Sequence, residues 1–273
     1  MIKECFKNVR KNCPLVHNIT NYVTVNDVAN MILACGGSPI MSDDINEVEE
    51  ITGICGGLNI NIGTLNQQTI LAMKQAAKKA KQLHKITLLD PVGVGASKLR
   101  TNTALELINS IHFDVIKGNA SEINALIMGS QKTRGVDACK EDIPTEDQLD
   151  FVIIRMKEYA KQTGSIIVMT GEIDLIANEN RCYVVRNGEK EMQSITGTGC
   201  QLAGLMSAFL IANSDHLMEA ALSAVCLMGH AGEQALLNMQ PSDGNATYRN
   251  RIIDAVYHMT PDELERGARY EIR

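Results

Sequence analysis

Short β-branched runs alternate with segments of helical period along most of this chain, and that alternation limits the folds it can adopt. Buried strands are predicted at residues 58–62, 86–89, 115–116 and 166–169, and helices at residues 24–34, 66–84, 101–111 and 146–162. Strands that alternate with helices form a parallel sheet that is covered by helices on both faces. The sequence therefore predicts an α/β fold with a mostly parallel central sheet.

Residues 173–186 depart from this alternation. Two short strands flank Asn178, Glu179 and Asn180, which predicts a hairpin and with it an antiparallel edge of the sheet. After Gly199 the chain is predicted to be mostly helical, and the polar residues 130–147 are expected to form a loop with a helical turn. The 273 residues contain no repeat and no second core pattern, so a single domain over residues 1–273 is expected.

Charge and composition exclude several classes of protein. Lys and Arg number 26 against 32 Asp and Glu, and the net charge of −6 argues against a nucleic-acid partner. Residues 192–214 carry no charge over a length that fits a membrane span, but their Gln, Ser, Thr and Gly content predicts a buried helix instead. The eight cysteines form no C-x-x-C pair, and the charged N-terminus lacks a signal-peptide core. A cytoplasmic location without a membrane partner is expected.

The sequence TGTGC at residues 196–200 is the strongest local sign of a ligand site. Gly197 and Gly199 allow successive backbone N–H groups to converge, and the predicted helix at residues 201–212 adds partial positive charge at its N-terminus. Such a loop can hold a phosphate oxyanion. A plain glycine turn with a capping threonine explains the same residues, and the local pattern does not separate these two interpretations.

Cys200 lies at the start of this predicted helix. A thiol at a helix N-terminus can have a lowered pKa and act as a nucleophile or a weak base. The alternative is a small buried hydrophobic residue. The position of Cys200 within TGTGC favours the functional interpretation.

Two carboxylates follow predicted strands. Asp90 ends the strand at residues 86–89, where a carboxylate beside a phosphate can orient Mg²⁺; an Asp that begins a turn is the alternative. Asn119 and Glu122 follow the strand at residues 115–116, and Glu122 can either cap the next helix, which the local pattern favours, or approach a metal. Two acidic strand ends together with a glycine-rich anion loop indicate Mg²⁺-dependent transfer of a nucleotide phosphoryl group.

Asn21 and Met41 flank the predicted helix at residues 24–34. They could offer an amide and an apolar wall to a small ligand. A capping Asn and a core Met are the simpler interpretation when these residues are taken alone.

These segments together resemble the hydroxyethylthiazole kinases of thiamine salvage, a family of the ribokinase-like superfamily. The resemblance covers residues 14–41, 58–65, 89–100, 116–123, 169–176 and 195–204. The opening VHNITN and the TGTGC loop distinguish this family from its relatives. The resemblance implies a ribokinase-like three-layer sandwich and a homotrimer with active sites between subunits. It also implies transfer of the ATP γ-phosphoryl group to the primary alcohol of 4-methyl-5-(2-hydroxyethyl)thiazole.

The resemblance also implies roles for individual residues. Cys200 takes the position where most ribokinase relatives have an aspartate base, so it is the candidate catalytic residue. The other expected contacts are Met41, Gly197 and Asn21 with the thiazole, Lys117, Thr170, Asn119 and Gly199 with ATP, and Asp90 and Glu122 with Mg²⁺. Many family members have arginine where Lys117 stands; lysine keeps the charge but loses the bidentate fork.

Three other functions are compatible with the same loops. The runner-up is another ribokinase-like kinase that acts on a pyrimidine or pyridoxal alcohol. An ATP-dependent hydro-lyase that repairs damaged nicotinamide cofactors shares the architecture, and a non-catalytic sensor of thiazole or nucleotide is the last alternative. The region of Asn21 and Met41 favours the thiazole, because that ring offers few hydrogen bonds and suits an apolar wall.

Overall fold

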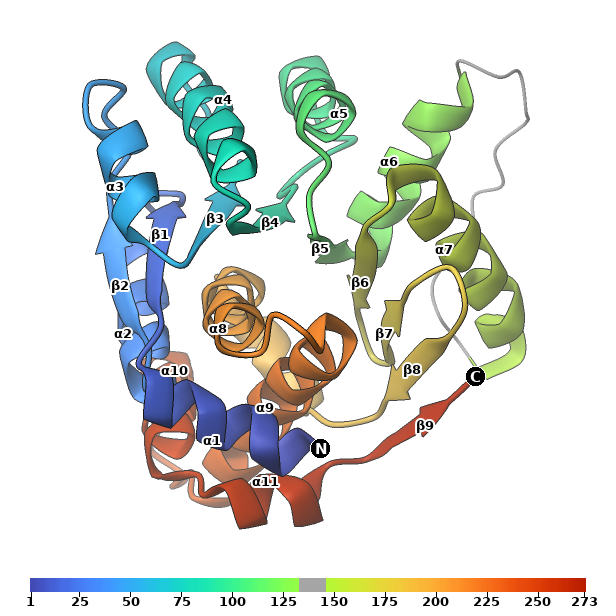
Figure 1. The fold of residues 1–273 in the computed structure, drawn as a ribbon. Helices are drawn as coiled ribbons and strands as arrows, with labels where there is room; N and C mark the ends of the chain where they lie inside the picture. The colour runs from blue at the N-terminus through green and yellow to red at the C-terminus, as the bar shows by residue number, and fades with distance from the viewer. Residues whose placement is uncertain (133–145) are drawn as a thin grey trace.

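One twisted sheet organises the molecule, seen in the computed structural model that describes residues 1–132 and 146–273 (Figure 1). In that part of the chain the sheet has nine strands in the order β2-β1-β3-β4-β5-β6-β7-β8-β9. They are β1 Leu15–Ile19, β2 Ser38–Met41, β3 Gly57–Asn61, β4 Ile86–Asp90, β5 Val115–Asn119, β6 Ile166–Thr170, β7 Asp174–Ala177, β8 Cys182–Val185 and β9 Tyr270–Ile272. All pairs from β2 to β6 are parallel, and those from β6 to β9 are antiparallel.

Helices cover both faces of this sheet and complete a three-layer sandwich (Figure 1). One face carries α3 Val48–Ile54, α4 Gln67–Gln82, α5 Lys98–Ile111, α6 Ala120–Lys132 and α7 Leu149–Thr163. The other carries α1 Ile2–Asn12, α2 Val25–Cys35, α8 Thr198–Ala212, α9 Leu217–Leu237, α10 Asn245–His258 and α11 Pro261–Gly267. Successive residues of a strand point alternately into the hydrophobic cores on the two faces of the sheet. Leu88 belongs to the core on the α8 side and Leu89 to the core on the α4 side.

The sequence predicted this architecture but missed three of its strands. The predicted α/β class, the mostly parallel sheet and the antiparallel edge are confirmed, and the hairpin at 173–186 is β7 and β8. Strand β9 pairs outside that hairpin, in a segment predicted to be helical. Strand β1 was missed because its His17 and Asn18 break the apolar pattern although both are fully buried. Strand β2 was missed because its four residues include Pro39. The predicted loop at 130–147 lies mostly outside the described residues.

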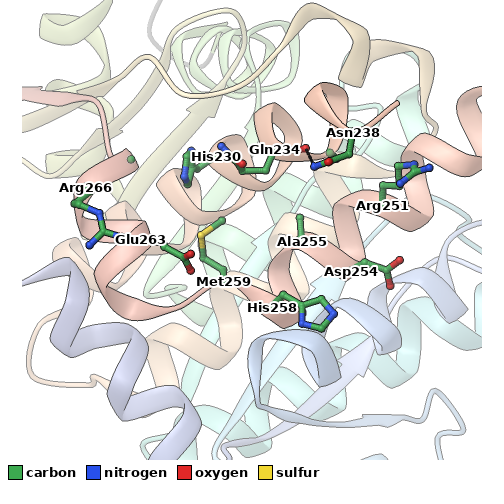
Figure 2. Close-up of a pocket in the computed structure, with 12 residues that line it drawn as sticks. His230, Gln234, Asn238, Arg251, Asp254, Ala255, His258, Met259, Glu263 and Arg266 are labelled. Atoms are coloured by element: carbon green, nitrogen blue, oxygen red, sulfur yellow. Dashed lines mark hydrogen bonds between the residues drawn. The ribbon is translucent and has the colours of Figure 1, made fainter. Parts of the chain in front are cut away.

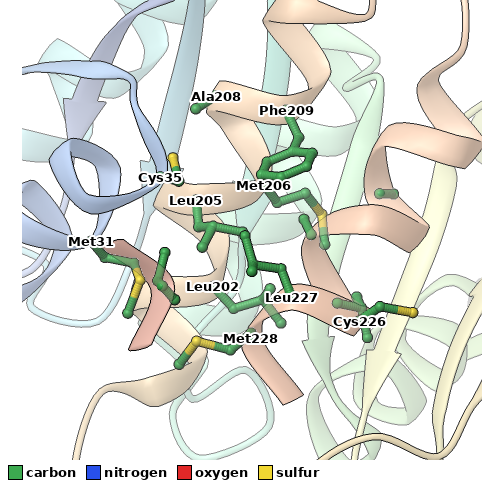
Figure 3. Packing of buried hydrophobic residues seen from close by; sticks show 14 of the residues in the cluster. Met31, Cys35, Leu202, Leu205, Met206, Ala208, Phe209, Cys226, Leu227 and Met228 are labelled. Atoms are coloured by element: carbon green, nitrogen blue, oxygen red, sulfur yellow. The ribbon is translucent and has the colours of Figure 1, made fainter. Parts of the chain in front are cut away.

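Helix α8 packs at the centre of the second layer. It contacts β1, β3, β4 and β5, and every residue from Cys200 to Leu210 is buried. Figure 3 shows its Leu202, Leu205, Met206 and Phe209 packed among side chains of α2 and α9. Most of the uncharged stretch at 192–214 is therefore a buried helix that is entered through a glycine-containing loop, as its composition predicted. Among the described residues no helix is long and apolar enough to cross a membrane.

Candidate active site

The carboxyl ends of three central strands bring a row of polar side chains together. Asn61 of β3 stands opposite Asp90 of β4 in the parallel register, and Leu89 stands opposite Ile116, so that Asp90 and Lys117 follow side by side. The Asn61 amide Nδ2 donates to Asp90 Oδ2 at 2.8 Å, and the Lys117 Nζ lies 3.5 Å from Asp90 Oδ1. All three side chains are buried on the α8 side of the sheet. Open α/β sheets bind their ligands at this end of the strands.

The N-terminus of α8 closes over this row. Gly197 is its N-cap with a φ of 86°, a left-handed conformation that glycine adopts without strain. The Lys117 Nζ donates to the Gly199 carbonyl oxygen at 3.0 Å, so the lysine joins the sheet to the first turn of the helix. A Cβ atom on residue 199 would lie 3.0 Å from that ammonium, so glycine lets the lysine approach this turn closely.

Burial and pairing control the charges in this row. Burial is the main cause that raises the pKa of Asp90, to about 6, against the opposing effect of the neighbouring Lys117. Burial alone would lower the pKa of Lys117, but the surrounding Asp90, Cys200 and Glu122 raise it above its ordinary value. The lysine is therefore a permanent cation under α8, close to where the sequence predicts a phosphate.

The Cys200 thiol meets two amide donors. Nδ2 of Asn21 lies 3.3 Å and Nδ2 of Asn61 lies 3.2 Å from the sulfur. Burial and the charge of Asp90 raise the pKa of Cys200, although Lys117 and the hydrogen bonds of Thr24 and Asn61 lower it. This direction is opposite to the lowered pKa that a helix N-terminus alone would give. The thiol is consequently protonated at neutral pH.

Glu122 caps α6, as the local pattern favoured. Its Oε2 accepts from the backbone N–H of Asn119 at 2.8 Å, and the Asn119 Oδ1 accepts from the Glu122 N–H at 2.9 Å. The other carboxylate oxygen accepts from the Gly93 N–H at 2.8 Å. Glu122 therefore ties the loop after β4 to the start of α6.

The two carboxylates fit a nucleotide-borne Mg²⁺ ion. Among the described residues no group of three His, Cys, Asp or Glu side chains could hold a metal by itself. Mg²⁺, however, is commonly held by one or two carboxylates together with substrate phosphates and waters. Asp90 and Glu122 are both buried, their charges interact, and each bonded carboxylate oxygen keeps a second lone pair. Such a donor set suits a shared ion rather than an all-protein cage.

The remaining predicted residues lie around this centre. Thr170 ends β6 opposite Asn119 at the end of β5, and its hydroxyl lies 3.4 Å from the Gly118 carbonyl oxygen. Asn21 follows β1; its Oδ1 accepts from the backbone N–H and the hydroxyl of Thr24. Met41 stands apart from the hydrogen-bonded group, partly buried on the edge strand β2 opposite Asn18.

Sequence reasoning missed two residues of this site. Asn61 bridges Asn21, Asp90 and Cys200, and its only signal was a polar position that alternates with apolar residues in LNINI at 58–62. Arg100 donates to the backbone carbonyls of Ile62, Gly63 and Val92, and so fastens the loops after β3 and β4 to each other. An isolated arginine directly before the predicted helix at 101–111 carries no such signal.

A groove of about 580 Å³ lies elsewhere in the molecule, among α9, α10 and α11. Figure 2 shows His230 and Gln234 of α9 along it, and Asn238 directly after that helix, with Arg251, Asp254 and His258 of α10. None of the sequence-predicted site residues is among those that line it. The groove is therefore separate from the centre built around α8.

The sheet order, the two helical layers and the glycine entry to α8 define a ribokinase-like protein. A pyridoxal kinase from Staphylococcus aureus has the same fold at a TM-score of 0.60 and 14% identity. The model of the hydroxyethylthiazole kinase family matches residues 6–262, and the chain belongs to that family.

Relatives match over nearly the full length. A hydroxyethylthiazole kinase from Clostridium acetobutylicum is 56% identical over 271 residues, which cover 99% of each chain. One from Desulfovibrio desulfuricans is 42% identical over 97% of this chain and 95% of its own. The solved structure of a hydroxyethylthiazole kinase protein from Pyrococcus horikoshii superposes with a TM-score of 0.87 at 32% identity, over 100% of this chain and 98% of that one.

Gly197→Ala tests the fit of the α8 entry. A Cβ atom there would overlap Thr24 Cγ2, in addition to the cost of a left-handed backbone. Gly164→Ala is the matched control, because its φ is 69° but nothing lies within 4 Å of the added atom. We expect Gly197→Ala to lose about 1–3 kcal/mol more unfolding free energy in urea than the control.

The double variant Gly197→Ala/Thr24→Ser removes the overlapping methyl group and keeps the hydroxyl. We expect it to recover most of that difference. Equal losses for Gly197→Ala and Gly164→Ala would contradict the close packing of this turn against Thr24.

Proposed function

We propose that this chain transfers the γ-phosphoryl group of ATP to the primary alcohol of 4-methyl-5-(2-hydroxyethyl)thiazole. The product would be the thiazole phosphate used to make thiamine phosphate. The observation that carries the proposal is the N-terminus of α8, which faces a buried lysine, a buried carboxylate and a thiol within one hydrogen-bonded group. Membership in the hydroxyethylthiazole kinase family supports the substrate.

The α8 entry and Lys117 form the proposed phosphoryl site. Backbone N–H groups of residues 197–200 lie at the positive end of a 15-residue helix, and the Lys117 ammonium lies beside them. Phosphoryl transfer through a loose transition state depends on alignment and on neutralisation of charge. These fixed donors supply both without reorganisation. Gly199, Asn119 and Thr170 complete the proposed ATP side, at the ends of β5 and β6.

Asp90 and Glu122 are the proposed holders of Mg²⁺. When bound, the ion would neutralise phosphate charge. The residues themselves are held in advance: Asn61 and Lys117 fix the Asp90 carboxylate, and two backbone N–H groups fix that of Glu122. Lys117 would also keep Asp90 ionised, since its charge lowers the pKa that burial raises.

The acceptor alcohol would bind between β1, β2 and the α8 entry. Met41 supplies an apolar wall, Gly197 packs closely against Thr24 at the edge of the site, and Asn21 borders the site next to Cys200. The Cys200 thiol, protonated because its pKa is raised, would align the hydroxyl rather than remove its proton early. This role suits a transition state in which the hydroxyl loses its proton late.

A second copy of the chain is expected to cover this side of the site. Tyr22 is 78% and Val23 is 59% exposed, directly after Asn21. Large exposed apolar side chains beside a binding site are typical of an interface. We propose a homotrimer with its sites between subunits, and a cytoplasmic location, because the proposed donor is an intracellular nucleotide.

The proposal predicts one product. Incubation with ATP, Mg²⁺ and the hydroxyethylthiazole is expected to release ADP and a thiazole heavier by one phosphoryl group, detected by mass. Chelation of the metal should abolish that product. ADP without a phosphorylated thiazole would instead favour the cofactor-repair reaction, and phosphorylation of only pyrimidine or pyridoxal alcohols would favour the runner-up kinase.

Cys200→Ala tests the aligning role of the thiol. A general base typically contributes about 100- to 10,000-fold, so an aligning group should cost less, and we expect kcat to fall about tenfold without loss of all activity. Cys35→Ala, which removes another fully buried thiol from α2, is the matched control and should leave kcat unchanged.

Full activity of Cys200→Ala would remove any role for this thiol. A Cys200→Asp variant that turns over faster than the parent would show that proton removal limits the rate.

A further inference from the structure

We propose that Asn61 is a positioning residue that sets the relative placement of the Cys200 thiol and the Asp90 carboxylate. The expected effect on kcat rests on the proposed function, whereas the placement of Cys200 and Asp90 by Asn61 does not. Asn61 does not need to touch either substrate: it acts through the two groups that its amide holds.

The Asn61 amide uses all of its hydrogen-bonding capacity inside the site. Its Nδ2 donates to Asp90 Oδ2 at 2.8 Å and to Cys200 Sγ at 3.2 Å. Its Oδ1 accepts from Asn21 Nδ2 at 2.9 Å and from the Gly63 backbone N–H at 2.9 Å. An amide has two N–H donors and an oxygen with two lone pairs, so none is left over. Asn61 is 1% exposed, which leaves no role for solvent in its orientation.

The chemistry of the partners allows only one orientation of this amide. Asp90 as a carboxylate can only accept, so it must face the NH₂ group. The Gly63 backbone N–H can only donate, so it must face the oxygen. A flipped amide would oppose both partners at once. The strand register that puts Asn61 opposite Asp90 therefore also determines which atom reaches Cys200.

Two amide donors fix the sulfur as an acceptor. Nδ2 of Asn61 and Nδ2 of Asn21 both point at Cys200 Sγ, at 3.2 and 3.3 Å. Asn61 also holds Asn21 in place, because its oxygen accepts the other Asn21 N–H. With both neutral-thiol lone pairs directed to these amides, the S–H hydrogen points away from them. The thiol is thereby presented in one direction, which is what alignment of an alcohol requires.

The same strand offers a matched control. Asn59 precedes Asn61 by two residues, so it lies on the same face of β3, and it is fully buried. Its Nδ2 donates to Asn18 Oδ1 at 3.0 Å, and that bond lies within the sheet away from Cys200 and Asp90. Substitution at 59 therefore removes a buried amide from the same strand without changing the contacts of the thiol.

The experiment compares Asn61→Ala and Asn61→Asp with Asn59→Ala and Asn59→Asp. Asn61→Asp keeps the shape and both acceptor contacts but has no donor for Asp90 or Cys200. We measure kcat and KM for ATP and the thiazole, urea unfolding, and the rate at which iodoacetamide alkylates Cys200, read from the mass of its peptide. The alkylation rate needs no substrate and no metal.

We expect both Asn61 variants to lower kcat by about 10- to 100-fold, as loss of a supporting hydrogen-bond partner typically does, while KM for ATP stays within about threefold. Asn61→Asp should also slow alkylation of Cys200, because the hydrogen bond from Asn61 lowers the pKa of that thiol. Both Asn59 variants should lose stability but keep kcat and the alkylation rate within about twofold.

If substitution of Asn61 and substitution of Asn59 changed kcat and the alkylation rate equally, the proposal would be overturned. Asn61 would then be only a structural amide. A loss of kcat with an unchanged alkylation rate in both Asn61 variants would overturn the assignment to Cys200. If the parent enzyme does not phosphorylate the thiazole, the proposed function fails, and the alkylation rates still decide whether Asn61 controls the thiol.

Discussion

The buried ammonium of Lys117 is the interaction on which the rest of this site depends. It contacts the Asp90 carboxylate on one side and the Gly199 carbonyl oxygen on the other, so one charge joins the central strands to the first turn of α8. A buried cation is costly unless it is paired and hydrogen-bonded. Here the pairing also keeps a carboxylate ionised that burial would tend to neutralise. The charges of the proposed phosphate site are thus in place in the folded chain before any ligand binds.

Two side-chain amides beside this ion pair fix the positions of the carboxylate and the thiol. Asn61 connects the ionised carboxylate to the thiol, and Asn21 supplies a second donor to the same sulfur. A thiol with a raised pKa is a poor base, but the rate through a loose transition state depends more on alignment than on base strength. Family membership and this geometry support the same reaction from independent directions.

Part of this site could be predicted from the sequence because it lies at strand ends. Asp90 directly follows an apolar run that predicts a strand, Glu122 lies six residues beyond another, and Cys200 follows two glycines before an apolar helix. Asn61 and strand β1 could not be predicted, because their polar side chains are satisfied by partners far along the chain. Asn61 meets Cys200 across 139 positions, a contact that no local pattern encodes.

The most direct measurement is a double-mutant cycle on the free energy of unfolding with Lys117→Met and Asp90→Asn. Each single variant leaves one buried charge without its partner, and we expect a loss of about 3–5 kcal/mol. The double variant should lose less unfolding free energy than the two single variants lose together, because neither charge remains. Losses that add to within about 0.5 kcal/mol would contradict the claim that this ion pair holds the site together.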